Sequence, residues 1–387
     1  MKIAHIAPPW FTVPPKHYGG TETVLFHLIE EQVAQGHEVI LLAPGDAKTT
    51  ARVVSFFEQS LIDSGIPWHA HLKAYYHLHQ SVEYVKDHAF DILHTHLSSS
   101  ADMYLFPLTA DLATPHLMTI HSRFPFDRVG NWIGDADAYY LKWASRIRAV
   151  AISQSARSQL PPELNVAGVV HHGVPMKLFE PTIDAPDEFF VWLGRMVPDK
   201  GPHLAIAAAR KAGVPLVLAG IVDHHIPEAV RYFRELIEPQ LDGCQIRYVG
   251  PVMLADKRDL LSRARALLNP IQWEEPFGMV MIEAMATGCP VITFPRGAAP
   301  EILAHGESGF LAQDVDEMAS FIKQIGLLDR SRVRAYAETH FSSQVMAERY
   351  LALYRQVSAG MQPGVYPDSR MIGAAPAGNE EPEMIRA

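Results

Sequence analysis

Two glutamates eight positions apart carry the most specific chemical signal in this sequence. Glu275 and Glu283 lie in the stretch NPIQWEEPFGMVMIEAMATGCPVITF. Its pattern predicts a strand ending at Pro270, a loop, and a helix that begins near Met279 and stops at Gly288. Two helical glutamates at this spacing would lie about 12 Å apart along the axis, too far to share a metal ion. We therefore expect Glu275 in the loop and Glu283 in the second helical turn, where carboxylates accept hydrogen bonds from hydroxyl groups.

The start of the same helix predicts an anion site. The backbone N–H groups around Gly278 and Met279 would be unpaired at a helix N-terminus, which favours phosphate. One loop and helix would then offer acceptors for sugar hydroxyls beside donors for phosphate, a pairing that suits a nucleotide sugar. The alternative for Glu275 alone is that it complements the helix dipole.

Two cations five positions apart open the second half of the chain, in VWLGRMVPDKGPHLAI. A buried strand runs into Gly194 and Arg195, and a turn leads to Lys200, Gly201 and a helix. Arginine binds phosphate bidentately, whereas lysine acts as a compact charge. We expect both to point into a cleft; the alternative is a pair of solvated surface charges.

A glycine pair marks the first strand–helix junction. The strand ends at Ala7, and the loop PPWFTVPPKHYGG leads to a helix that begins near Gly20. Ligands in parallel sheets bind at the carboxyl ends of strands, and Gly19 and Gly20 would let one approach the backbone closely. The alternative is an ordinary helix start capped by Thr21. The loop is not GxGxxG, which argues against a dinucleotide oxidoreductase.

Three histidines follow apolar runs in the first half. His94 and His96 are two apart, so on a strand both rings lie on one face. Two histidines without a third ligand make a poor metal site, and we expect His96 at the mouth of a cleft, hydrogen-bonded to a sugar or an acceptor. His121 ends the next apolar run and is predicted to face the cleft. Its alternative is a structural histidine under a loop.

Two Asp-x-Asp triplets resemble divalent-metal motifs. Both Asp135–Asp137 and Asp314–Asp316 precede helical patterns, so N-capping is the better interpretation. We therefore expect no required metal and no cofactor, with Arg195 and Lys200 supplying the positive charge instead.

Length and composition set the class of protein. The 387 residues suggest two domains, and 48% hydrophobic with 20% charged residues is ordinary for a globular protein. Two cysteines, Cys244 and Cys289, exclude a disulfide scaffold and fit a reducing cytoplasm. A net charge of −10 argues against general nucleic-acid binding. No apolar run reaches the ~18–20 residues of a membrane span, and the N-terminus MKIAHIAPPW predicts a strand rather than a signal peptide.

Short apolar runs alternate with amphipathic stretches along the whole chain. This order predicts α/β architecture with mostly parallel sheets. The expected strands are 2–7, 38–43, 91–94, 116–120, 148–152, 189–193, 215–219, 245–249, 266–268 and 291–294, and the helices include 21–35, 203–212 and 227–238.

The proline-rich, acidic stretch 175–188 interrupts this alternation and predicts a linker. We therefore expect two Rossmann-like domains, 1–174 and 189–341, facing one another across a cleft. The tail 361–387, rich in proline, glycine and glutamate, is expected to be disordered.

These motifs together resemble the family 4 glycosyltransferases, which have the GT-B fold. The resemblance runs from Met1 to about Val357 and rests on E-x7-E (Glu275 to Glu283), GR-x4-KG (Gly194 to Gly201) and Gly19-Gly20-Thr21-Glu22. It implies retaining transfer of a hexose from a UDP- or GDP-sugar, with an acceptor domain before the linker and a donor domain after it. It also implies that a last helix, here 342–357, returns to the first domain.

The resemblance implies a role for each motif residue. Gly20 would lie near the donor diphosphate, His121 would contact the transferred sugar, and Arg195 and Lys200 would stabilise the leaving diphosphate. Glu275 would hold sugar hydroxyls together with the N–H groups of Phe277, Gly278 and Met279, and Glu283 would bind the ribose. Two departures are His172-Gly173-Val174-Pro175, where the family often has Asn-Gly-Val-Asp, and Gly297-Ala298-Ala299, where Gly-Gly is usual.

Three alternatives stay open. One is another GT-B enzyme, an epimerase or a phosphorylase, and another is a non-catalytic sugar-binding module. The third is a transferase peripheral to the inner membrane face that acts on a lipid-linked acceptor, since Tyr139–Arg148 (YYLKWASRIR) mixes aromatic and basic residues as interfacial helices do. The commoner interpretation of that stripe is a helix packed on the core.

Overall fold

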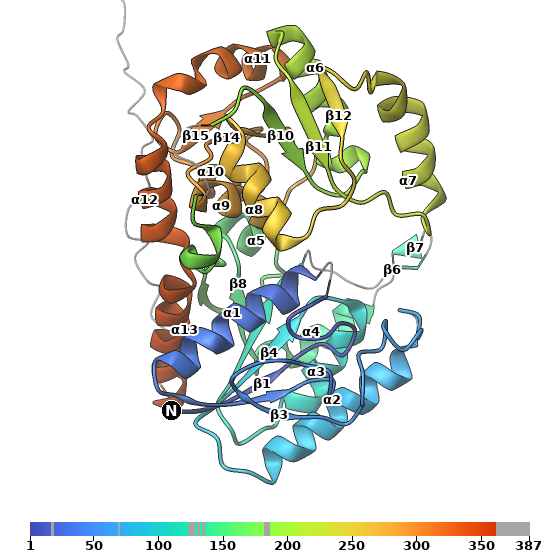
Figure 1. Ribbon diagram of the computed structural model, residues 1–387. Helices are drawn as coiled ribbons and strands as arrows, with labels where there is room; N and C mark the ends of the chain where they lie inside the picture. Colours follow the sequence, from blue (N-terminus) through green and yellow to red (C-terminus); the bar gives the residue numbers. More distant parts are fainter. Residues whose placement is uncertain are drawn as a thin grey trace, which may run out of the picture.

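Each half of the chain forms its own parallel sheet, as the apolar runs predict (Figure 1). The computed structural model describes residues 1–16, 19–68, 70–122, 128–129, 132–133, 136–181 and 186–360. The expected disorder of 361–387 therefore lies outside the described residues, as do residues 182–185 of the expected linker. The separation between the two sheets falls between residues 169 and 190.

The first sheet has the strand order β3-β2-β1-β4-β5-β8-β9, and every neighbouring pair is parallel. Sequence analysis did not identify the two edge strands. Edge strands bury less surface, and β3 begins with the exposed Arg52, so their apolar signal is weak. The strands are β1 (Lys2–Ile6), β2 (Glu38–Leu42), β3 (Arg52–Val54), β4 (Ile92–Leu97), β5 (His116–Ile120), β8 (Arg148–Ala151) and β9 (Asn165–Val169).

The second sheet has the order β12-β11-β10-β13-β14-β15 and is also parallel throughout. Its unpredicted strand is again at an edge, β15. A short two-stranded ribbon, β6 (Arg128–Val129) with β7 (Trp132–Ile133), lies outside both sheets. The strands are β10 (Phe190–Leu193), β11 (Leu216–Ala219), β12 (Ile246–Tyr248), β13 (Leu267–Asn269), β14 (Val291–Thr293) and β15 (Gly309–Leu311).

Helices cover both faces of each sheet, and their buried side chains form the core. Over the first sheet, α1 (Gly20–Ala34) and α13 (Ser343–Ser358) share one face, while α2 (His71–Lys86), α3 (Leu105–Thr109) and α4 (Ala136–Ala144) share the other. Over the second sheet, α6 (Pro202–Ala212) and α11 (Val315–Gln324) pack opposite α8 (Leu254–Arg263), α9 (Met279–Ala286) and α12 (Arg330–Phe341). Shorter helices are α5 (Gln154–Ser158), α7 (Pro227–Tyr232) and α10 (Ala299–Ile302). The helix expected over 227–238 leaves α geometry after Tyr232 and continues as a π-helical turn, Phe233–Ile237.

The chain returns to its first sheet at the end. Helix α12 packs on the second sheet, and α13 lies beside α1 against the first (Figure 1). The crossing is held by Val174, whose N–H donates to the Phe341 carbonyl at 2.9 Å and whose carbonyl accepts from the Ser343 N–H at 2.9 Å. The returning helix spans nearly the residues that sequence analysis expects.

The aromatic and basic stripe 139–148, which begins on α4, packs its apolar side chains on the core and leaves Lys142 and Arg146 exposed. Leu141, Trp143 and Ile147 belong to the apolar cluster beneath the first sheet, while Tyr139 is 58% exposed beside Lys142. Among the described residues, no helix combines the length and the apolar character that a membrane crossing requires.

Candidate active site

The predicted site residues lie at the carboxyl edges of the two sheets. Strand order reverses between β1 and β4 in the first sheet and between β10 and β13 in the second. Crevices of parallel sheets open at such reversals, outside the carboxyl ends of the strands. Gly20 comes after β1, Arg195 after β10 and Glu275 after β13. His96 lies near the end of β4, and His121 directly follows β5.

Lys200 and Glu275 form an ion pair, although 75 positions separate them in the chain. The indole Nε1 of Trp273 also donates to Glu275 Oε2 at 3.1 Å, and Lys200 Nζ lies 5.1 Å from the centre of that indole ring. The two charged side chains are 21% and 15% exposed, so solvent weakens their attraction only in part. A further bond, from Trp192 Nε1 to the Lys200 carbonyl at 3.0 Å, holds the lysine backbone in place.

The loop before α9 leaves the first N–H groups of the helix without a side-chain cap. Its N-cap residue is Gly278, with φ of 93°, a left-handed conformation that favours glycine. The Glu275 carbonyl accepts from the Ala298 N–H at 2.9 Å, which ties this loop to the one after β14. A Cβ on Gly297 would lie 2.2 Å from the same carbonyl oxygen, so glycine is needed there while Ala298 and Ala299 are accommodated.

Glu283 also has a lysine partner, one that sequence analysis missed. Lys257 Nζ on α8 donates to Glu283 Oε1 at 2.6 Å. Burial and, second, the positive charge of Lys257 lower the pKa of His27, on α1, to about 4. Lys257 stands in no motif, so only the packing of α8 on α9 reveals it.

A stack of rings joins His121 to the Glu275 loop across the two halves. The His121 and His172 rings lie 5.2 Å apart and nearly parallel, and His172 meets Phe277 edge-on at 4.9 Å. Met279 contacts the apolar clusters of both halves. His172, in the segment that departs from the family pattern, therefore makes one of the contacts between the two halves.

Further contacts between the halves come from Glu301. Its carboxylate accepts from the backbone N–H groups of Gln154 and Ser155, each at 2.6 Å, and lies 3.2 Å from His171 Nε2. Ser153 donates its hydroxyl to the Pro276 carbonyl at 2.7 Å. These bonds join the start of α5 to the second half, and sequence analysis did not foresee them.

The structure places His96 behind His121 rather than at the mouth of the cleft. His96 is 2% exposed. Its Nδ1 lies 2.9 Å from His121 Nε2, and its Nε2 lies 3.1 Å from His5 Nδ1. His121 is the partly exposed member of the pair. A direct sugar contact in this conformation is therefore available to His121 and not to His96.

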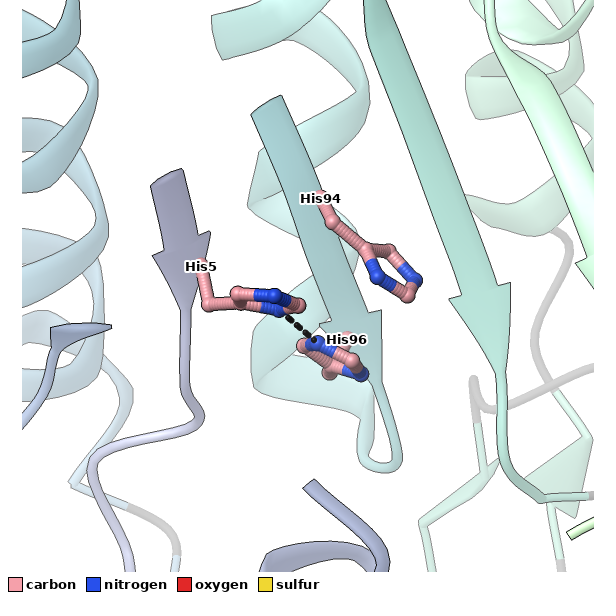
Figure 2. Close-up of side chains that lie close together, drawn as sticks. All are labelled: His5, His94 and His96. Atoms are coloured by element: carbon pink, nitrogen blue, oxygen red, sulfur yellow. Dashed lines mark hydrogen bonds between the residues drawn. The ribbon is translucent and has the colours of Figure 1, made fainter. Parts of the chain in front are cut away.

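His5, which sequence analysis did not single out, joins His94 and His96 in a buried group (Figure 2). One nitrogen from each of the three lies within 4.8 Å of the others, the spacing of a metal site. Each nitrogen nevertheless has a protein partner: His94 contacts Tyr354 Oη at 2.6 Å and Thr119 Oγ1 at 2.7 Å. Burial lowers the pKa of His5 to about 4 and those of His94 and His96 well below the usual value.

The remaining predicted residues have open surroundings or a structural role. Arg195 is exposed at the end of β10. A Cβ placed on Gly20 would meet no protein atom within 4 Å. Asp314 caps α11, accepting from the N–H groups of Asp316 and Glu317 at 2.9 and 2.8 Å, which confirms the capping interpretation. Asp135 lies outside the described residues.

Two buried carboxyl groups lie close by in the first half. Glu22 on α1 is 4% exposed, and burial raises its pKa to about 7. Burial raises the pKa of Asp102 to about 6, against the opposing effect of the Ser98 and Ser99 N–H groups that donate to it. Both carboxyl groups bind protons more tightly here than in an unfolded chain.

Known proteins with related sequences cover most of the chain. "Spore coat protein SA" of Bacillus subtilis (strain 168) is 24% identical over 392 residues, spanning 92% of this chain and all of the relative. The "Phosphatidyl-myo-inositol mannosyltransferase" of Mycolicibacterium smegmatis is 28% identical over 354 residues, spanning 87% of this chain and 86% of the relative.

Solved structures share the fold. The sucrose-phosphate synthase of Thermosynechococcus elongatus superposes with a TM-score of 0.72 at 21% identity, covering 93% of this chain and 99% of that one. The Anabaena HepE protein, solved in complex with UDP and glucose, gives 0.67 at 19% identity, covering 91% and 98%.

Family profiles cover both halves of the molecule. The one described as "Glycosyltransferase Family 4" matches residues 18–178, and the one described as "Glycosyl transferases group 1" matches residues 176–338. The first takes in the sheet that carries His121, and the second takes in the sheet that carries Lys200 and both glutamates. With these motifs on two facing parallel sheets, the chain belongs to the family 4 glycosyltransferases and has their GT-B fold.

Proposed function

We propose that this glycosyltransferase moves a hexose, with retention of anomeric configuration, from a UDP- or GDP-sugar to a hydroxyl acceptor, without a metal ion or other cofactor. The observation that carries the proposal is the convergence of three features at the edges of the sheets. These are the Lys200–Glu275 pair, the uncapped start of α9, and His121, which the ring stack links to the same loop. Together they offer positive charge for a diphosphate beside acceptors for sugar hydroxyls.

The barrier to transfer lies in breaking the anomeric C–O bond. Positive charge builds on the sugar and negative charge on the departing diphosphate. Lys200, Arg195 and the N–H groups at the starts of α1 and α9 stabilise the leaving group. Fixed charges and dipoles of this kind are usually the largest catalytic contribution. They are already in place in the protein, so the leaving group needs no metal ion.

The sugar and the ribose are held by the two glutamates. Glu275 accepts from sugar hydroxyls, and the N–H groups of Phe277, Gly278 and Met279 donate to the donor substrate beside it. Glu283 accepts from the ribose hydroxyls. Both carboxylates are kept in place by lysines, Lys200 and Lys257 respectively.

Retention follows from attack on the same face as the leaving group. Glu275 is engaged by Lys200 and by Trp273, so it is a poor candidate for a covalent nucleophile. The acceptor oxygen forms the new bond to the anomeric carbon while the C–O bond to the diphosphate breaks. The proton of the acceptor hydroxyl passes to the departing phosphate oxygen.

The acceptor is a sugar, a small polyol or a lipid-linked hydroxyl. The mannosyltransferase relative is named for phosphatidyl-myo-inositol, which supports a lipid-linked acceptor at a membrane surface. The packing of the α4 stripe on the core favours an acceptor met away from the membrane instead. Liposome sedimentation separates the two: binding to anionic vesicles supports the first, and none supports the second.

A panel of nucleotide sugars tests the proposed function. The protein is incubated with UDP-glucose, GDP-mannose or ADP-glucose, with and without candidate acceptors, and diphosphate release is measured. We expect one donor to be consumed, at the same rate in excess EDTA, and the product to keep the donor's anomeric configuration by NMR. A new epimer without acceptor would support an epimerase, and a need for inorganic phosphate would support a phosphorylase. Donor binding without turnover under any condition would support a sugar-binding module.

Gly20→Ala tests the diphosphate position in the first half. An added Cβ meets no protein atom within 4 Å, and alanine is favourable in a helix, so the thermal midpoint should be unchanged. If the donor diphosphate lies against this backbone, the methyl group displaces it and KM for the donor rises roughly tenfold. Gly36→Ala, where the added Cβ would also meet nothing within 4 Å but φ is 83°, is the opposite control: it should lower stability and leave KM unchanged.

A further inference from the structure

A line of hydrogen-bonded side chains runs from the returning helix to His121. Gln32, on α1, donates its amide to Tyr354 Oη on α13 at 3.2 Å, and its Oε1 lies 2.8 Å from His5 Nε2. The line continues from His5 Nδ1 to His96 Nε2 at 3.1 Å, drawn as the dashed bond in Figure 2. It ends where His96 Nδ1 lies 2.9 Å from His121 Nε2.

The chemistry of Gln32 gives this line a direction. An amide oxygen can only accept, so His5 must carry its proton on Nε2. A neutral imidazole has one N–H, which leaves His5 Nδ1 as an acceptor and requires His96 to donate from Nε2. The same step repeats at the next ring: His96 Nδ1 accepts, and His121 donates from Nε2.

The rings are neutral at physiological pH, so each carries a single N–H. Burial lowers the pKa of His5 to about 4 and that of His121 to about 3, and that of His96 lies well below the usual value. The end of the line is His121 Nδ1, which has no hydrogen-bond partner among the described residues and is shielded from solvent. A buried polar atom without a partner is costly, and a substrate hydroxyl that donates to it removes the cost.

We propose that Gln32 is a positioning residue which, through His5 and His96, holds the proton of His121 on Nε2 and keeps Nδ1 as an acceptor for a substrate hydroxyl. This inference rests on the proposed function, in which His121 contacts the transferred sugar. The position of the His121 proton decides whether Nδ1 accepts or donates. With its proton on Nδ1, the ring would donate there and could not accept a hydrogen bond from a substrate hydroxyl.

A metal ion at His5, His94 and His96 is the competing account of the cluster. A metal needs an unprotonated nitrogen from each ring aimed at one point. Here the nitrogens of His5 and His96 face each other, and both nitrogens of His94 face hydroxyl groups. The line and the two hydroxyl partners of His94 therefore account for every nitrogen that a metal would take.

Gln32→Met tests the proposal in the full-length protein. Methionine has nearly the shape of glutamine but accepts no strong hydrogen bond, so a proton on His5 Nε2 would be buried without a partner. In either tautomer of the variant, one end of the line carries an unpaired N–H, so the preference that Gln32 imposes is lost, and a substantial share of the His121 rings should carry the proton on Nδ1. In protein labelled with 15N-histidine, the ring-nitrogen shifts distinguish the two tautomers, and the variant His121→Asn identifies the signals of this ring.

Tyr350→Phe is the matched control. It removes a buried hydrogen bond of the same cluster, between Thr119 Oγ1 and Tyr350 Oη at 2.9 Å, outside the line from Gln32 to His121. We expect both variants to lose similar thermal stability, but only Gln32→Met to place protons on His121 Nδ1 and to lower kcat by about twofold or more, with KM for the donor unchanged.

Two results would overturn the proposal. One is an unprotonated His121 Nδ1 in Gln32→Met, and the other is one equivalent of tightly bound zinc in the wild-type protein by elemental analysis. The NMR measurement needs no substrate, so it stands even if every donor in the panel fails. Failure of the panel would instead count against the proposed function.

Discussion

Replacing Lys200 by alanine is expected to slow sugar transfer by about 100- to 1,000-fold, the usual effect of removing one group that stabilises developing negative charge. The change removes the cation that faces the leaving diphosphate, while the Trp273 indole still donates to the Glu275 carboxylate. The loss should appear in kcat, because the charge it balances develops only as the bond breaks. Diphosphate release under saturating donor measures it.

Lys211→Ala is the control for that experiment. Lys211 lies at the other end of α6 and pairs with Asp316 at the surface, where an ion pair contributes little. Its turnover should match the wild type. If Lys200→Ala keeps wild-type turnover while remaining folded, the leaving-group role is wrong, and Arg195 with the helix N-termini must carry that charge alone.

The free energy of unfolding should fall steeply as the pH falls from about 6.5 to 4. Burial lowers the pKa values of several histidines far below the ~6.5 of an unfolded chain. At pH values between the folded-state and unfolded-state pKa, a histidine is protonated in the unfolded chain and neutral in the folded one. Acid therefore favours unfolding, by up to about 1.4 kcal/mol per pH unit for each histidine. The histidines with pKa values lowered to about 3 or 4 are His5, His27, His77, His116 and His121.

Glu22 and Asp102 act in the opposite direction. Their pKa values are raised to about 7 and about 6, so the folded state holds their protons while the unfolded carboxyls release them until about pH 4. These two carboxyl groups do not offset the five histidines. The pKa values of His94 and His96, also lowered by burial, add to the loss, so the free energy of unfolding should fall by at least about 3 kcal/mol between pH 6 and pH 5. Urea denaturation at pH 7, 6 and 5 measures it.

His116→Gln checks the origin of that slope. His116 is not a member of the line to His121, and its Nε2 is 2.8 Å from Thr95 Oγ1. Glutamine does not titrate, so the variant's slope should be shallower by about 1.4 kcal/mol per pH unit. Denaturation midpoints that stay constant over this pH range would show that these histidines are accessible to protons in the folded state.

The central strands and most helices were predictable because buried parallel strands are continuous apolar runs. The runs at β1, β5 and β10 end within one residue of the structure, whereas β3, β9 and β15 were missed. Those three lie at sheet edges, where one side of the strand lacks a neighbour and polar residues are tolerated. Their place in the sheet, not their own sequence, makes them strands.

The site residues also fall into a predictable and an unpredictable group. Glu275, Lys200 and Gly278 were predictable because they stand in motifs or at glycine-marked turns beside a strand end. Lys257 and His5 were not, because each acquires its role from a partner distant in the chain: Glu283 is 26 positions from the first, and His96 is 91 positions from the second. Residues that meet in space but lie far apart in the chain form no motif, so the sequence alone does not indicate that they interact.

The return of α13 to the first sheet has a consequence for biosynthesis. Tyr350 and Tyr354 complete the core over β1 and β4, strands that the ribosome makes some 250 to 350 residues earlier. Until α13 emerges, the nascent chain exposes that apolar face and the buried imidazoles beneath it. The domain that is translated first therefore completes its core last. In the interval, chaperones or fast elongation must keep its exposed apolar face from aggregating.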